Sequence, residues 1–183
     1  MKRMVYTRKS DGGVSVCVPA AEAIAHLCSG GFWPSVRGFC EWQIELQIAR
    51  GVGHDAAQRY ARAMVSGGCT TAEALAIIRD RDCAHLGTMI ELFDIDELPG
   101  DRWFRDAWTR SHNGGPVYVY LPRARRVQID RIKGAVAQRN RRRLLLGRAL
   151  IAPAWGSIGN AIRHARDEHE LRRVWPEGLP CPQ

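Results

Sequence analysis

Histidine and cysteine, the residue types that most often perform chemistry in proteins, are scattered along this chain of 183 residues. The most enzyme-like stretch is Ser111-His112-Asn113-Gly114-Gly115, because glycine amides beside a histidine can hold an oxyanion. The same stretch is typical of a tight turn before a strand. No phosphate-binding glycine loop and no His-Glu-x-x-His motif occurs. We therefore predict a protein that is not an enzyme and uses no cofactor.

Metal binding is the second kind of chemistry that the cysteines suggest. Cys83 and His85 form a Cys-x-His pair, and Cys69 lies one predicted helix earlier. A structural zinc requires four ligands, and the sequence supplies no obvious fourth. We expect no metal, no disulfide framework, and mostly buried thiols that act as small apolar side chains.

An aromatic and arginine-rich segment, residues 101–108, has the composition of a partner-binding hot spot. Its spacing predicts a short helix with Phe104 and Trp108 stacked at i and i+4 and with Asp–Arg pairs at the same spacing. A core-facing helix explains the same pattern and is the favoured interpretation, because buried aromatic residues are mostly structural. The candidate partner-binding residues are Trp103, Phe104, Arg105 and Trp108.

Positive charge gathers in the second half of the chain. Residues 101–183 carry 17 Lys/Arg and 7 Asp/Glu, whereas residues 1–100 carry 10 and 12. This excess favours an acidic partner, either nucleic acid or an acidic protein face, and a solvated helix face is the alternative. The candidate binding residues for such a partner lie on or just after one long predicted helix: Arg123, Arg126, Arg131, Lys133, Arg139, Arg141, Arg142, Arg143 and Arg148.

Two predicted helices around Gly67-Gly68, residues 54–81, resemble the outline of a helix-turn-helix. The first turn of the second helix presents Thr71, Ala72 and Glu73, which are not the side chains that read base edges, and Glu73 opposes phosphate. Two packed structural helices are therefore the favoured interpretation.

These candidates must be positioned by an α+β fold. Two β-rich runs around Ser10-Asp11-Gly12-Gly13 predict an N-terminal β-hairpin, and residues 88–93 predict a third strand of a small antiparallel sheet. The remainder is mostly helical. The predicted helices cover residues 19–28, 38–50, 54–65, 71–81, 101–109, 122–150 and 157–166, with a last one from 167, and 117–120 predicts a strand or an extended segment. Thr70 with Glu73 predicts a capping box at the start of the helix over 71–81, and Asp167 with Glu170 predicts a similar cap at the last helix.

The long basic helix 122–150 carries Arg125, Ile129, Ile132 and Val136 at spacings that predict one core-facing stripe. We expect residues 1–121 to form an α+β core and residues 122–183 to pack on that same core. No apolar run approaches the roughly 20 residues of a membrane helix, and no signal peptide is visible, so we expect a soluble intracellular protein without a membrane partner.

Three stretches are familiar when taken together: Thr7-Arg8 with Asp11–Ser15 and Pro19, then Leu98–Trp108, then Glu170–Glu177. They resemble small accessory proteins encoded by alphaproteobacterial phages and prophages, often near tail modules. The matches cover under a quarter of the chain, and the helical region between about 30 and 70 is an insertion relative to shorter members. The resemblance transfers no catalytic residue.

The resemblance implies a phage protein that is made in the cytoplasm of the bacterial host or also built into the virion. It implies a role in virion or tail assembly through contacts with a phage structural protein. The charge distribution leaves a second hypothesis open, a phage effector that inhibits a host protein complex, such as a nucleic-acid machine or defence complex, or that binds nucleic acid. Both hypotheses require basic side chains displayed on the surface rather than neutralised by internal carboxylates.

Overall fold

The computed structural model describes residues 2–180 and confirms the α+β fold class. The chain forms two compact units, which we call unit 1 (Met1–Leu98 with Arg110–Pro116) and unit 2 (Pro99–Thr109 with Val117–Gln183). This division differs from the predicted boundary at residue 121, because part of the segment 99–109 belongs to the hydrophobic cluster of the C-terminal helices. Among the described residues each unit has a hydrophobic cluster of its own. The packing of residues 122–183 on the core of residues 1–121 stays a prediction.

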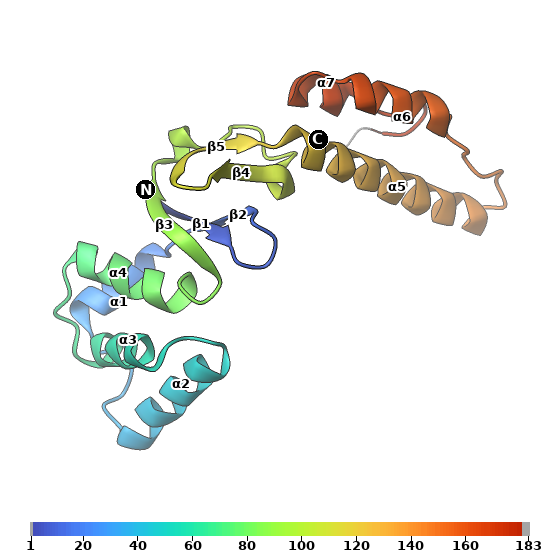
Figure 1. Cartoon of the computed structure of the whole chain (residues 1–183). Helices are drawn as coiled ribbons and strands as arrows, with labels where there is room; N and C mark the ends of the chain where they lie inside the picture. The colour runs from blue at the N-terminus through green and yellow to red at the C-terminus, as the bar shows by residue number, and fades with distance from the viewer. Residues whose placement is uncertain (1, 181–183) are drawn as a thin grey trace. The chain divides into compact units, whose positions relative to one another are not determined.

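Unit 1 contains a three-stranded antiparallel sheet in the order β2-β1-β3 (Figure 1). Its strands are β1 (Arg3–Arg8), β2 (Val14–Cys17) and β3 (Gly87–Phe93). The predicted hairpin and third strand are confirmed, with Met4 paired to Cys17 across β1 and β2. The hairpin turn is closed by the Arg8–Asp11 ion pair at 2.8 Å, and Gly12 takes the positive φ of 67° that such turns require.

The helices of unit 1 are α1 (Ala21–Ser29), α2 (Arg37–Ala49), α3 (His54–Ser66) and α4 (Thr71–Asp82). The predicted positions are confirmed to within a few residues. Thr70 and Glu73 form the predicted capping box at the start of α4, where the Glu73 carboxylate accepts the Thr70 amide at 2.8 Å. Helix α2 differs from expectation, because none of its residues is buried although its sequence is apolar on a broad face. The cluster of unit 1 includes Met4, Tyr6, Leu27, Tyr60, Met64, Ala74 and Ile78.

A second hairpin, β4 (Trp108–Ser111) and β5 (Gly114–Val119), follows the short 3-10 turns η1 (Ile95–Glu97) and η2 (Arg105–Ala107). The prediction of a helix over 101–109 was wrong. Asp101 accepts the Trp103 amide at 2.8 Å in a local turn, and its carboxylate pairs with Arg172 at 2.7 Å. A tertiary ion pair therefore replaces the Asp101–Arg105 pair that a helix would have formed.

The tip of this second hairpin belongs to unit 1 and contains a buried arginine. The guanidinium of Arg110 lies 2.9 Å from Glu91 Oε2 and donates to Thr7 Oγ1 at 3.1 Å. Burial lowers the pKa of Arg110, and the Glu91 charge opposes this shift. Gly114, at φ 87°, lies against the same carboxylate, since a Cβ there would be 2.5 Å from Glu91 Oε1.

Replacing Gly114 with alanine is expected to lower the free energy of unfolding by about 2–3 kcal/mol. The new methyl group must displace Glu91 from the buried Arg110, and the positive φ adds backbone strain. Gly115→Ala is the matched control, because Gly115 has φ 93° but an added Cβ meets nothing closer than 3.9 Å. Urea titration followed by circular dichroism measures both variants, and equal losses would show that the Glu91 contact is unimportant.

Unit 2 is built from α5 (Leu121–Leu145), α6 (Trp155–His164) and α7 (Glu168–Arg173), with α6 and α7 packed on α5 (Figure 1). Helix α5 ends five residues before the predicted end, because Gly147 takes a positive φ of 63° and the chain turns. Its buried stripe is Ala124, Gln128, Ile132 and Val136. Ile132 and Val136 were predicted, whereas Arg125 and Ile129 are only half-buried.

Gln128 explains the difference in the stripe. Its side-chain oxygen accepts the indole N–H of Trp103 at 2.8 Å, and its amide nitrogen donates to the Val174 carbonyl at 2.8 Å. A polar side chain is tolerated in a core when its hydrogen bonds are satisfied. The face of α5 turned to the core therefore includes a residue that hydrophobic periodicity leaves out.

Candidate interaction surface on helix α5

The aromatic side chains predicted as partner anchors are buried. Trp103, Phe104 and Trp108 are 7%, 1% and 2% exposed, so the prediction that they anchor a partner was wrong, and of the four candidates only Arg105 is exposed. Two guanidinium groups lie against the Trp103 ring, with Arg131 at 4.6 Å and Arg172 at 4.9 Å from its centroid. Trp103 and Phe104 belong to the hydrophobic cluster of unit 2, as the core-facing interpretation requires.

The basic residues predicted on α5 divide into an exposed and a half-buried set. Arg131 packs on Trp103, and the Arg143 guanidinium donates to the Ala149 carbonyl, so both have structural roles. Arg123 is also half-buried. The exposed set is Arg126, Lys133, Arg139, Arg141, Arg142 and Arg148.

Internal carboxylates do not neutralise this charge. From Arg131 to Arg166 the sequence contains nine Lys/Arg and no Asp/Glu. With Arg123 set aside, none of the predicted basic residues forms an ion pair with an Asp or Glu between residues 2 and 180. Both functional hypotheses require basic side chains that are displayed on the surface and not neutralised by internal carboxylates. Within residues 2–180 the exposed set meets this requirement.

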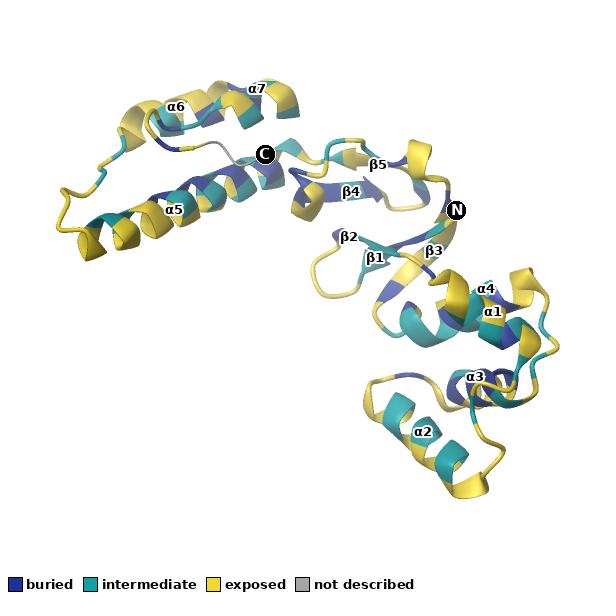
Figure 2. Cartoon of the chain, turned by 180° about the vertical axis from the view of Figure 1, so that it is seen from behind, coloured by how far each residue is buried: buried dark blue, intermediate teal, exposed yellow. Residues whose placement is uncertain are grey.

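The end of α5 carries exposed leucines beside its arginines. No residue from 137 to 150 is buried, and Figure 2 shows this part of α5 and the turn after it mostly as exposed. Leu145 is 86% exposed, Leu144 68% and Leu146 65%. We call this surface the basic tip. Its members are Arg139, Arg141, Arg142, Arg143, Leu144, Leu145, Leu146, Arg148 and Leu150.

The basic tip is held in one conformation by hydrogen bonds across the turn. The side chain of Asn140 binds both backbone groups of Ile151, donating to its carbonyl at 3.0 Å and accepting its amide at 2.7 Å. The Arg148 amide donates to the Arg143 carbonyl at 2.8 Å, closing the helix end. Leucines on an ordered turn lose less conformational entropy when a partner binds than leucines on a flexible loop.

The remaining candidates for chemistry are dispersed in the structure. His112 is exposed in the β4–β5 turn, so no buried histidine accompanies Gly114 and Gly115. A hollow of about 540 Å³ in unit 1 is lined by His54, Asp80 and His85, but Asp80 is already paired with Arg59 at 2.8 Å. Within residues 2–180 no group of three or more His, Cys, Asp or Glu side chains is arranged to hold a metal ion, and the cysteines described there are free thiols.

Comparisons with known proteins yield no relative. No family model matches the chain, and neither a curated protein nor a solved structure matches it. The resemblance to phage accessory proteins therefore stays a prediction from the sequence. Among the helices that the structure describes, none is long and apolar enough to cross a membrane.

The sequence analysis did not identify the leucines and Asn140 as parts of the site. The predicted helix continued to residue 150, which would have placed Leu144–Leu146 on a regular helical surface. Gly147 was the available signal, because a glycine directly after a helical run with arginines in its last turn is typical of a helix end. The bonding between Asn140 and Ile151 has no signal in the sequence.

Proposed function

We propose that this protein is a phage-encoded, non-enzymatic protein that acts by binding other proteins during virion or tail assembly. It is made in the cytoplasm of the bacterial host, and it can remain in the particle. The basic tip is its binding surface, and the partner protein presents an acidic surface to it. The resemblance to phage accessory proteins supports the phage context, and the exposed arginines, unpaired with any described carboxylate, support the binding role.

The leucines of the tip favour a protein over a nucleic acid as partner, and this is the observation that carries the proposal. Neutralising phosphates requires Lys and Arg but no leucine. A nucleic acid bound to the arginines would leave Leu144, Leu145 and Leu146 in water, where they are 65–86% exposed. A protein interface covers an apolar centre and a charged rim together.

Purification of phage particles tests the proposal. In a lysogen that carries the gene, an epitope-tagged protein is expected to co-purify with particles or tail intermediates after induction. Arg139→Glu combined with Arg141→Glu and Arg142→Glu is expected to reduce recovery about tenfold or more, because like charges then face an acidic partner. The control Arg62→Glu with Arg102→Glu and Arg163→Glu changes the net charge equally at exposed arginines that are not members of the tip. Absence of the wild-type protein from particles and intermediates overturns the proposal.

A second candidate function rests on the acid-free stretch from Arg131 to Arg166. Such a stretch can bind nucleic acid, either directly or as part of an effector that blocks a host nucleic-acid machine or defence complex. Titrating duplex DNA and RNA at rising salt measures this binding. If the five arginines of the tip contact phosphates, affinity falls roughly 500-fold between 50 and 200 mM salt. No binding at the lower salt concentration removes the direct nucleic-acid version.

A further inference from the structure

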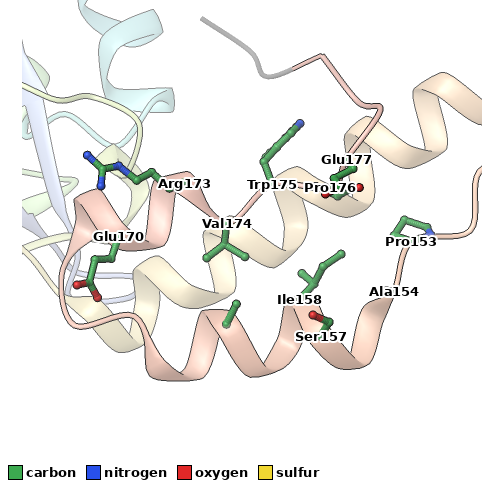
Figure 3. A pocket seen from close by; sticks show the side chains of 11 residues that line it. Pro153, Ala154, Ser157, Ile158, Glu170, Arg173, Val174, Trp175, Pro176 and Glu177 are labelled. Atoms are coloured by element: carbon green, nitrogen blue, oxygen red, sulfur yellow. The ribbon is translucent and has the colours of Figure 1, made fainter.

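A pocket in unit 2 does not select a ligand by its charge. It has a volume of about 630 Å³ and opens beside α6 and α7 (Figure 3). Glu170 and Arg173 both line it, and Glu170 is already paired with Arg166 at 3.4 Å. Unit 1 offers a more specific arrangement, because two of its thiols are in contact.

Cys17 and Cys83 are far apart in the sequence and adjacent in unit 1. Cys17 is the last residue of β2, and its register partner on β1 is Met4. Side chains of paired residues lie on the same face of a sheet, and Met4 belongs to the hydrophobic cluster of unit 1 together with Cys83. Cys17 packs against this cluster, and the two thiols share a hydrogen bond. The fold therefore makes a dithiol from two cysteines that belong to no common sequence motif.

The two thiols differ in accessibility and in acidity. Cys17 is half-buried at the end of its strand, whereas Cys83 is 0% exposed. The hydrogen bond that Cys83 donates lowers the pKa of Cys17, because it stabilises the Cys17 thiolate, and burial opposes this shift. The same hydrogen bond raises the pKa of Cys83, and burial raises it further. Cys17 is therefore the nucleophile of the pair, and Cys83 is the thiol that keeps its proton.

We propose that Cys17 and Cys83 form a reversible disulfide when hydrogen peroxide oxidises the protein. Redox-sensing cysteines are accessible thiols that lie beside a second, resolving thiol, and this pair has that arrangement. The proposal goes beyond the proposed function, because the pair belongs to unit 1 and the basic tip to unit 2.

The oxidation proceeds in two steps. The Cys17 thiolate attacks one peroxide oxygen, the O–O bond breaks, and Cys17 becomes a sulfenic acid. The hydroxide ion that leaves takes up the proton that Cys17 lost. The Cys83 sulfur then attacks the Cys17 sulfur, the S–O bond breaks, and the S–S bond forms. The Cys83 proton leaves with the hydroxyl group as water, so two thiols lose two electrons and the peroxide becomes two water molecules.

The disulfide would fasten β2 to the end of α4. All four helices of unit 1, α1 to α4, lie between residues 17 and 83, so the bond closes a loop that contains them. Closing a long loop restricts the unfolded chain and thereby favours the folded one. Oxidation is therefore expected to make the opening of unit 1 rarer.

Mass spectrometry of the oxidised full chain tests the proposal. The reduced protein is treated with hydrogen peroxide, its remaining thiols are alkylated, and it is digested without reduction. The expected product joins the peptides that contain Cys17 and Cys83, and dithiothreitol separates them. Hydrogen exchange of the α1–α4 amides is expected to slow about tenfold or more in the oxidised chain. Cys40→Ser, at a half-buried thiol of α2, is the matched control and leaves the cross-link intact.

Single variants establish the order of the two steps. Cys83→Ser is expected to stop at the sulfenic acid of Cys17, which dimedone labels, because no resolving thiol remains. Cys17→Ser is expected to give no sulfenic acid at the buried Cys83. Circular dichroism establishes that each variant is folded. The proposal is overturned by a wild-type chain without the Cys17–Cys83 link, by amide exchange that oxidation leaves unchanged, or by dimedone labelling of Cys83 in the Cys17→Ser variant.

Discussion

Replacing Gly67 with alanine is expected to lower the free energy of unfolding of unit 1 by about 4 kcal/mol. The ends of α1 and α3 meet backbone to backbone, and a Cβ on Gly67 would lie 2.4 Å from the Gly30 nitrogen. Two hydrogen bonds bracket the contact, Gly31 N–H to the Val65 carbonyl at 2.9 Å and Gly68 N–H to the Cys28 carbonyl at 2.8 Å. Separating the two backbones to admit a methyl group breaks these bonds.

Gly68→Ala is the control for this prediction. Gly68 also has a positive φ, 84°, but nothing lies within 4 Å of a Cβ there. Its replacement is expected to cost only the backbone strain, about 1–2 kcal/mol. Urea unfolding monitored by circular dichroism gives both free energies, and hydrogen exchange of the α1 and α3 amides locates the change. Equal losses for the two variants would mean that the Gly30–Gly67 approach is not tight in solution.

Replacing Gln128 with leucine is expected to destabilise unit 2 by about 3 kcal/mol, although leucine is the more apolar residue. The change leaves the Trp103 indole N–H and the Val174 carbonyl without their partner, and each unsatisfied buried group costs about 1–3 kcal/mol. For a chain of this length the melting temperature is expected to fall by roughly 6–12 °C. Differential scanning calorimetry measures this shift.

Gln138→Leu provides the comparison on the same helix, because Gln138 is exposed. It is expected to change stability by less than about 0.5 kcal/mol, as surface substitutions usually do. The indole fluorescence of Trp103 reports on the same site, since its N–H loses an acceptor only in the Gln128 variant. A melting temperature that is equal in the two variants contradicts the role given to Gln128.

The surface chemistry of unit 2 and its interior depend on the same helix. Along α5, Gln128 and Ile132 face the core, while Arg139, Arg141 and Arg142 extend past the last buried residue, Val136. Stability and binding can therefore be varied separately. Substitutions of the buried residues up to Val136 test the fold, and substitutions of the exposed Arg139, Arg141 and Arg142 test the proposed interface.

The amino-acid sequence alone determined the local structure of this protein. The turn at Asp11-Gly12, the capping box of Thr70 and the side-chain cap of Asp167 were predicted from residue type and spacing, and each is formed. These features depend on interactions within a few residues, so nearby sequence specifies them. The concentration of positive charge in the second half of the chain was likewise predicted from the sequence, because net charge is a sum over its residues.

Tertiary structure decided which candidate residues are accessible. Trp103 and Trp108 had the composition of a binding site but are 7% and 2% exposed. Gln128 and Arg172, far away in the sequence, bind Trp103 and Asp101, and residues 105–107 form a 3-10 turn in place of the predicted helix. Leu145 looked like part of a helix face and is exposed at its end. The spacing of residues along the sequence does not predict such long-range hydrogen bonds and ion pairs. These interactions determine whether an aromatic or apolar side chain lies in the core or on the surface.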